Sequence, residues 1–260
     1  MKRYIKRILS VIGVILCSLA VTVVGYGSEG VISKDSIVVS SGTSSEPAAY
    51  PAAPVDVDEN IFMNFASLKE QNADVYAWIM IPGTMDGLPV VQRSSAEDPY
   101  DDFYLNHTID LVEGYPGAIY SQPINSIDFT DPVTVLYGHN MKDGSMFGCL
   151  HEFEDKNYFD KGHNVIIYTP QHMLVYEIFS AIHFSDALIT YEYDFSDQTG
   201  IQMYLDDIMG SKGNFNSGVT VTADDKILTL STCFSNRDSE RLLIEAVLIE
   251  KREAPMEPEY

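Results

Sequence analysis

From residue 76 to residue 250 the chain is a series of short apolar runs separated by turn residues. Such runs, rich in Val, Ile, Leu and Tyr, are typical of β-strands. They predict strands over residues 76–81, 88–92, 117–120, 133–137, 164–169, 174–182, 219–221, 226–232 and 242–250. Because helical segments do not alternate with these strands, the pattern favours a mostly antiparallel sandwich or closed barrel. The predicted fold class is mostly β.

Two segments show helical periodicity instead. In residues 59–72 apolar side chains recur at helical spacing, which predicts an early helix through Ile61, Phe65 and Leu68. The second segment follows Ser196 and Asp197, which are candidate capping residues. Its apolar residues form one stripe, at Ile201, Tyr204, Leu205, Ile208 and Met209. This stripe predicts a helix inside a long connection between two strands.

At the N-terminus a basic cluster precedes an uncharged apolar run over residues 8–26; the cluster consists of Lys2, Arg3, Lys6 and Arg7. A membrane-spanning helix needs roughly 20 apolar residues, and positive charge marks its cytoplasmic end. A cleaved signal peptide, with Gly25 or Gly27 near the cut, is the alternative, but its apolar region is usually about 7–15 residues long. We therefore expect residues 1–27 to be an uncleaved, single-pass membrane anchor and the rest of the chain to be extracytoplasmic.

Composition divides the remainder into three segments. Residues 28–54 are rich in Ser, Gly, Ala and Pro and have few large apolar side chains, so we expect a flexible spacer. Residues 55–252 have the size of one catalytic domain. Residues 253–260 are expected to form an acidic tail.

The charge of the chain narrows the classes of partner. The 260 residues include 38 acidic and 16 basic side chains, which gives a net charge of −22. Because the basic cluster precedes the first acidic residue, the domain that follows is strongly negative and repels phosphate backbones. We therefore expect no nucleic-acid partner and favour neutral or cationic partners. The 45% hydrophobic content is that of a globular protein and excludes a wholly disordered chain.

The three cysteines fit neither a disulfide framework nor a zinc site. Cys17 lies in the apolar N-terminal run, and Cys149 lies among apolar residues that predict a short packed helix. We assign Cys149 to the core. Cys233 follows a predicted strand, and a polar segment over residues 234–240 separates it from Arg241, near which the next strand begins.

If these two strands form a hairpin, Cys233 and Arg241 face the same space. A guanidinium there would favour the thiolate and could donate to the oxyanion formed when the thiolate attacks a carbonyl. Arg237 lies in the middle of the predicted loop, where ordering its side chain costs more, so we favour Arg241. A buried structural cysteine beside a surface arginine is the alternative.

His139 is the best candidate for proton transfer because it follows predicted strand 133–137 and Gly138, where a scaffold strand can present a side chain at its end. The other histidines have less support. None of them forms a zinc-type pair four residues apart with an acid between, so we expect no metal and no cofactor.

Three segments together resemble the motifs of a sortase: TLSTC at 229–233, RLLI at 241–244 and YGHNMKDGSMF at 137–147. The segment NADVYAWIMIPGT at 72–84, the PVVQ and YLNH segments and the helix-bearing insertion are similar to class B sortases in particular. The resemblance implies a closed β-barrel of about eight strands with N-terminal helices. It also implies a membrane-anchored cysteine transpeptidase of Gram-positive cell surfaces.

By this resemblance Cys233 is the nucleophile, His139 transfers the proton, and Arg241 orients the substrate and stabilises the oxyanion. The backbone N–H of Phe234 would donate to the same oxyanion. The family's reaction cleaves the C-terminal sorting signal of a surface protein after its Thr and forms a thioacyl-enzyme. The acyl group then passes to an amine of a peptidoglycan precursor or of a pilin.

Asn106 and Ser231 match positions that contact the sorting peptide in class B enzymes.

Two other classes of protein are possible from the sequence: a secreted papain-like or wall-hydrolase cysteine peptidase, and a surface adhesion module with an inert cysteine. In the peptidase the Cys would precede the His along the chain, whereas here His139 precedes Cys233.

Overall fold

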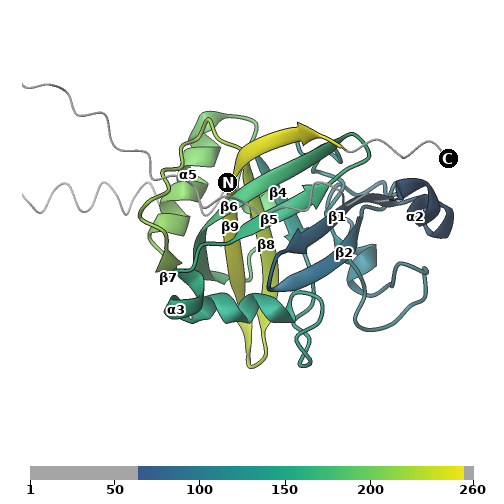
Figure 1. Ribbon diagram of the computed structural model, residues 1–260, viewed down its shortest axis with the longest axis horizontal. Coiled ribbons are helices and arrows are strands. Elements are labelled where there is room, and N and C mark those ends of the chain that lie inside the picture. Colours follow the sequence, from purple (N-terminus) through teal and green to yellow (C-terminus); the bar gives the residue numbers. More distant parts are fainter. Residues whose placement is uncertain (1–63, 255–260) are drawn as a thin grey trace, which may run out of the picture. The chain divides into compact units, whose positions relative to one another are not determined.

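The computed structural model describes residues 64–254, in which strands dominate (Figure 1). The strands are β1 (Val75–Ile81), β2 (Met85–Val91), β3 (Ile119–Tyr120), β4 (Val133–Tyr137), β5 (Asn164–Tyr168), β6 (His172–Ser185), β7 (Lys212–Phe215), β8 (Ile227–Phe234) and β9 (Arg237–Glu253). The α-helices are α2 (Phe65–Gln71), α3 (Lys156–Phe159), α4 (Ile189–Glu192) and α5 (Gln198–Met209), and the 3₁₀-helices are η1 (Phe103–Leu105) and η2 (Gly148–Glu154). The predicted anchor and spacer lie outside this described part, as do the first residues of the predicted catalytic domain and most of the acidic tail.

Eight of the described strands close into a barrel. Their order is β5–β1–β2–β3–β4–β8–β9–β6, and pairing of β5 with β6 completes the ring, while β7 extends the sheet beyond β6. The pairs β2–β3 and β4–β8 are parallel, and the other pairs are antiparallel. The mostly antiparallel closed barrel predicted from the sequence is confirmed, and the sandwich is wrong.

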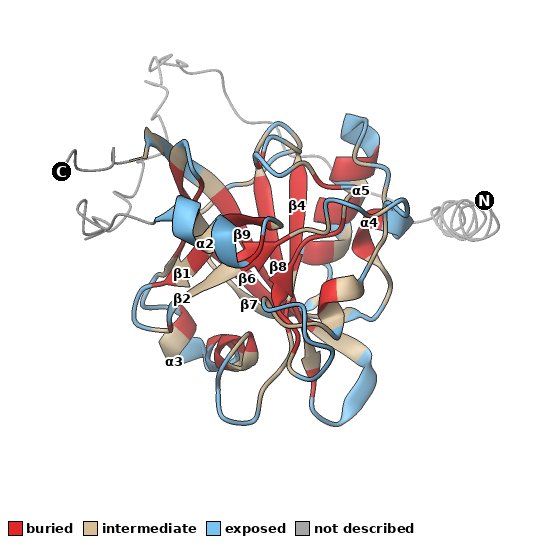
Figure 2. Ribbon diagram, turned by 90° about the vertical axis from the view of Figure 1, so that its right-hand side faces the viewer, coloured by how far each residue is buried: buried red, intermediate tan, exposed pale blue. Residues whose placement is uncertain are grey.

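Two apolar clusters stabilise this arrangement by removing large side chains from water. The first fills the barrel and includes Leu150 and Phe153, which η2 inserts among the strands. The second lies where α5 packs against the outside of the sheet, with Tyr204 and Ile208 against Val135. Figure 2 shows the resulting continuous burial along β4 and β8, the two strands that lead to the candidate site.

The predicted helix after Asp197 is confirmed as α5. The Asp197 side chain accepts a hydrogen bond from the backbone N–H of Gly200 and so caps the first turn. Four members of the predicted stripe are buried, whereas Met209 is 62% exposed. Met209 lies at the edge of the stripe and is the last helical residue, so it leaves the packed face.

The early helix is confirmed in part. Within the described residues it begins at Phe65, and the side chain of Asn64 caps it by accepting from the backbone N–H of Ser67 at 2.9 Å. Residues 59–63 lie outside the described part. None of the helices between residues 64 and 254 has the length and apolar character needed to cross a membrane.

The predicted strand over residues 219–221 is wrong. Val219 and Val221 pack as loop side chains against the cluster beneath α5. The extra strand is instead β7, where Gly213 approaches β6 so closely that an added Cβ would lie 2.1 Å from the Ala181 carbonyl oxygen. Apolar alternation indicates which side chains are buried, and burial does not require strand pairing.

The β8–β9 hairpin is longer than predicted. β8 continues to Phe234 and β9 begins at Arg237, so only Ser235 and Asn236 lie between the two strands. The predicted loop over residues 234–240, with Arg237 in its middle, is therefore wrong. Polar residues indicate that a segment is exposed to solvent. They do not distinguish a loop from the exposed end of a β-hairpin, which has the same polar composition.

Candidate active site

Strand pairing brings the ends of β4 and β8 to one place on the barrel. The two strands are parallel, and Tyr137 lies opposite Ser231. His139 lies two residues after Tyr137, and Cys233 lies two residues after Ser231, so both reach the same end of the sheet. Backbone and side-chain bonds continue the pairing beyond β4: Gly138 N–H donates to the Ser231 carbonyl at 3.2 Å, and Thr232 Oγ1 donates to the Gly138 carbonyl at 2.8 Å.

A cleft of about 360 Å³ opens at this point. Cys233, His139 and Arg241 all line it, together with buried Ser231 and with residues between β6 and α4. Among the described residues the cleft thus combines a thiol from β8, a guanidinium from β9 and an imidazole from the segment that follows β4, and these three strands are neighbours in the sheet.

Arg241 lies directly opposite Cys233 in the antiparallel β8–β9 pair. The register shifts immediately after Cys233, and the Arg241 side chain spans the shifted segment. Its Nη1 donates to the carbonyls of Asp238 and Glu240, both at 2.9 Å. The remaining guanidinium N–H groups have no partner within residues 64–254, which leaves donors available to a bound carbonyl or oxyanion.

His139 is held by η1. Its Nε2 lies 2.9 Å from the carbonyl oxygen of Leu105, and its ring centroid is 4.8 Å from that of Tyr115. A carbonyl only accepts, so Nε2 carries a proton and donates to Leu105. In the part of the chain that the structure describes, Nδ1 has no hydrogen-bond partner, so it is the ring nitrogen left for proton exchange with a substrate.

The other sequence-predicted residues lie in different surroundings. Asn106 is exposed at the C-terminal end of η1 and does not line the cleft, although its neighbour Leu105 does. The Phe234 side chain is buried outside the cleft, with its ring against His151 and His183. The contribution predicted for Phe234 is that of its backbone N–H, and in the structure the Phe234 backbone pairs with Arg237 across the turn of the β8–β9 hairpin.

Arg237 does not line the cleft. Its Nη1 donates to the Glu240 carboxylate at 3.0 Å and to His183 Nδ1 at 3.2 Å, and its guanidinium lies 5.0 Å from the Phe234 ring centroid. The hydrogen bond from Arg237 holds the pKa of Glu240 below its ordinary value. These contacts commit Arg237 to the opposite side of the hairpin from Arg241.

Cys149 is a core residue, as the sequence predicted. Only 8% of its surface is exposed, and it packs among the side chains that fill the barrel. Burial raises the pKa of its thiol to about 11. The thiolate is the reactive form of cysteine, so Cys149 is poorly suited to attack a substrate at neutral pH.

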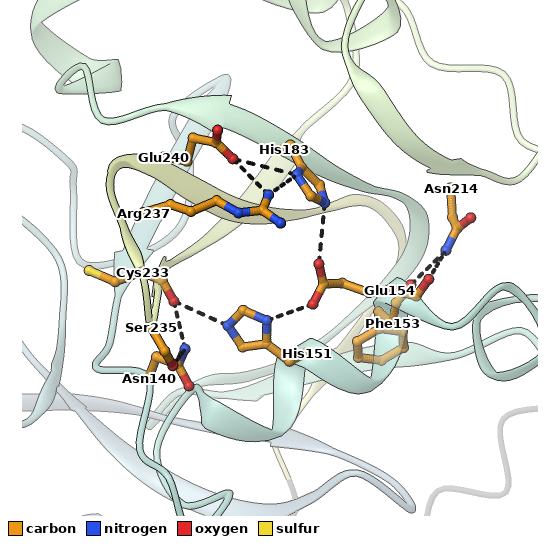
Figure 3. Close-up of polar contacts among 10 residues, drawn as sticks. All are labelled: Asn140, His151, Phe153, Glu154, His183, Asn214, Cys233, Ser235, Arg237 and Glu240. Atoms are coloured by element: carbon orange, nitrogen blue, oxygen red, sulfur yellow. Dashed lines mark hydrogen bonds and ion pairs between the residues drawn. The ribbon is translucent and has the colours of Figure 1, made fainter.

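Two residues that the sequence did not single out hold the backbone of Cys233. Asn140 Nδ2 donates to the Cys233 carbonyl at 2.8 Å, and His151 Nε2 lies 3.1 Å from the same oxygen (Figure 3). They stand 93 and 82 residues from Cys233 in the chain. Asn140 lies in the motif at 137–147, directly after His139, but only the fold shows that it and His151 meet the Cys233 carbonyl.

A closed barrel with a thiol, an imidazole and a guanidinium in one cleft is the arrangement expected of a cysteine acyltransferase. Comparison with known proteins specifies the class. The sequence model of the sortase domain matches residues 79–249, and the chain therefore belongs to the sortase family. Sortases are cysteine transpeptidases, so the papain-like peptidase and the inert adhesion module are both wrong.

The relatives are class B sortases. Sortase B of Listeria monocytogenes is 29% identical over 208 residues, which cover 77% of this chain and 80% of that protein. Among solved structures, sortase B of Clostridium perfringens has a TM-score of 0.63 at 28% identity and covers 72% of this chain and 100% of its own. A Bacillus anthracis protein similar to sortase B has a TM-score of 0.62 at 32% identity and covers 75% of this chain and 86% of its own.

Proposed function

We propose that this sortase cleaves the C-terminal sorting signal of surface proteins after a Thr and joins the new carboxyl group to an amine of a cell-wall precursor or a pilin. The observation that carries the proposal is the shared cleft of Cys233, His139 and Arg241. Solved relatives include a complex of Staphylococcus aureus sortase B with substrate and a sortase B complexed with triglycine. Those complexes support a peptide donor and an amine acceptor for this chain also.

In the first half-reaction the Cys233 thiolate attacks the carbonyl carbon of the Thr. A C–S bond forms, and the carbonyl electron pair moves to oxygen as an oxyanion. Arg241 donates hydrogen bonds to that oxygen. The backbone N–H of Phe234 would have to leave its pairing with Arg237 to donate to the same oxygen. His139 then gives a proton to the leaving nitrogen, the C–N bond breaks, and the thioester remains on Cys233.

In the second half-reaction the acceptor amine attacks the thioester carbon. His139 takes a proton from the attacking nitrogen, the oxyanion collapses, and the C–S bond breaks to regenerate the thiolate. One amide is exchanged for another, so the cycle needs no oxidant, metal or cofactor. Asp102 and Asp186 line the same cleft, and their carboxylates favour the approach of a cationic amine acceptor.

The location of the reaction follows from the sequence pattern. Residues 1–27 would anchor the enzyme in the membrane, residues 28–54 would hold the domain away from it, and residues 55–252 would form the catalytic domain. Ser231, buried in the cleft wall, would contact the sorting peptide directly. Asn106, exposed beside Leu105, would contact it at the rim.

The proposal is tested with the full-length protein in detergent and a library of internally quenched peptides, each with one Thr and varied flanking residues. Triglycine is the acceptor, and products are identified by mass spectrometry. We expect a product in which the Thr carboxyl is joined to triglycine, and none from Cys233→Ala. Cleavage at other positions, or hydrolysis that triglycine does not intercept, would contradict the proposed reaction.

A further inference from the structure

Two segments outside the barrel strands line the cleft and contact each other. We call them the η1 wall, which consists of Tyr100, Asp102 and Leu105, and the α4 wall, which consists of residues 186–189. The ring of Tyr100 lies edge-on to the ring of Tyr191 on α4, with the two centroids 5.4 Å apart. Because Tyr191 is 69% exposed, this ring contact joins the two walls at the protein surface.

A buried amide joins the same two walls inside the protein. Gln122 is only 3% exposed, and it lines the cleft. Its Oε1 accepts a hydrogen bond from Thr190 Oγ1 of α4 at 2.8 Å, and its Nε2 donates to the Tyr100 carbonyl at 3.0 Å. Tyr137 Oη, at the end of β4, donates to the same Oε1 at 3.4 Å. One side chain thus ties both walls to the barrel.

Gln122 lies at the end of the cleft away from the reacting groups. Tyr120 of β3 lies opposite Tyr137 of β4, and these two strands are antiparallel. The chain after Tyr137 continues to His139, so the chain after Tyr120 runs in the other direction. Gln122 therefore holds the walls where residues of a bound peptide remote from the scissile bond would lie.

The hydrogen bonds of Gln122 use both ends of its amide group. Thr190 is 6% exposed, so its hydroxyl has little access to water as an alternative partner. A buried polar group that loses its partner is costly, and the surrounding structure shifts to reduce that cost. Removal of the amide should therefore release α4 and Tyr100 from their positions. The strands that carry Cys233 and Arg241 keep their own pairing.

We propose that Gln122 is a positioning residue that holds the η1 wall and the α4 wall at a fixed separation and so determines how tightly the cleft binds the sorting peptide. The inference rests on the proposed function, which gives the cleft a peptide to bind. Fixed walls lower the conformational cost of binding, because the peptide does not have to order them. The hydrogen bonds of Gln122 reach neither Cys233 nor His139, so its effect falls on binding rather than on bond cleavage.

The test compares two substitutions in the full-length enzyme. Gln122→Met keeps the length of the side chain and removes the amide, whereas Thr190→Val removes only the contact with α4. Asn72→Leu is the matched control, because Asn72 is 4% exposed and its side chain makes three hydrogen bonds, but it does not line the cleft. Steady-state kinetics are measured on the peptide that the wild-type enzyme cleaves best, with triglycine at saturation. Alkylation of Cys233 by iodoacetamide reports on the thiol.

We expect Gln122→Met to raise the KM for the peptide about 10-fold, with little change in kcat or in the rate of alkylation. Thr190→Val should raise KM less. The double variant should be no worse than Gln122→Met, because the two changes break one shared contact. Asn72→Leu should leave KM unchanged. A loss in kcat as large as the rise in KM, an equal rise in KM in Asn72→Leu, or multiplying effects in the double variant would overturn the proposal.

A second measurement needs no turnover and keeps this result separate from the proposed function. The backbone N–H groups of residues 191–193 donate to the carbonyls of Leu188 and Ile189, and their hydrogen exchange is followed by mass spectrometry. We expect exchange over residues 188–193 to be about 10-fold faster in Gln122→Met and unchanged in Asn72→Leu. Unchanged exchange in Gln122→Met would overturn the positioning role even if no tested peptide were cleaved. The expected exchange without cleavage by the wild-type enzyme would instead count against the proposed substrate.

Discussion

The barrel interior and the end of the β8–β9 hairpin each contain a cysteine, and the two thiols differ in burial and in the polar groups around them. Cys149 is packed among apolar side chains, and burial raises its pKa to about 11. Cys233 is partly exposed in a cleft, opposite a guanidinium and beside an imidazole. The difference teaches that position on the sheet, rather than residue type, makes one thiol chemically useful.

Exchange of each cysteine for alanine gives the largest expected contrast. Cys233→Ala should abolish turnover, because no other group can form the thioester. Cys149→Ala should keep most of it and lose some stability, because the thiol fills space in the core. Both variants are assayed on one peptide after circular dichroism confirms folding, and comparable losses from both would undo the assignment.

The second prediction concerns the proton-transfer role of His139, which lines the same cleft as Cys233. His139→Ala should be nearly as damaging as Cys233→Ala, because members of one catalytic unit are not additive. The double variant should therefore be little worse than either single one. Turnover is measured for all three variants on one peptide. If the fold-loss in turnover of the double variant equals the product of the fold-losses of the two single variants, the residues act independently.

Arg237 and Arg241, at the start of β9, provide the next largest contrast. Arg241→Ala should lose about 10²–10³ in kcat/KM, and Arg241→Lys should recover little, because an ammonium cannot reproduce the planar set of donors. Arg237→Ala should change kcat/KM only a few-fold, since its guanidinium pairs with Glu240 outside the cleft. If Arg237→Ala is the crippled variant and Arg241→Ala behaves as wild type, the cleft described here does not hold the oxyanion.

The smallest effect concerns stability and involves Glu245, which is fully buried on β9. It accepts from Thr229 Oγ1 at 2.7 Å and from Tyr204 Oη at 2.9 Å. Burial raises its pKa from 4.5 to about 7. Because the folded-state pKa lies above the unfolded value, its favourable contribution is complete below pH 4.5 and is lost as the pH rises toward about 7.

Glu245→Gln keeps a neutral side chain of the same shape and should remove this pH dependence. Relative to wild type, we expect the urea midpoint to rise at pH 8 and to stay close to wild type at pH 4. At pH 8 the free energy of unfolding of Glu245→Gln should exceed that of the wild type by on the order of a few kcal/mol. Equal destabilisation at both pH values would show that the substitution damages packing and that the carboxyl group is not the source.

The sequence predicted the parts of this enzyme that depend on local pattern. Apolar runs located most strands, and the alignment of Cys233 with Arg241 followed from treating them as the facing ends of a hairpin. Polar composition was less informative, since the polar residues 237–240 belong to β9 and not to a loop. The contact of His151 with the Cys233 carbonyl required a 3₁₀-helix to pack beside a strand end 82 residues away, and local pattern contains no information about such packing.

The most direct test of the account is to identify the acylated cysteine. The full-length enzyme is mixed with an intact peptide that it cleaves, in the absence of an acceptor amine, and the reaction is quenched in acid. The protein is then digested, and its fragments are examined by mass spectrometry with and without hydroxylamine treatment. The account predicts an acyl group that ends in Thr on the fragment containing Cys233, removed by hydroxylamine, with Cys149 unmodified. An adduct on Cys149, or rapid turnover with no hydroxylamine-sensitive adduct on Cys233, would contradict it.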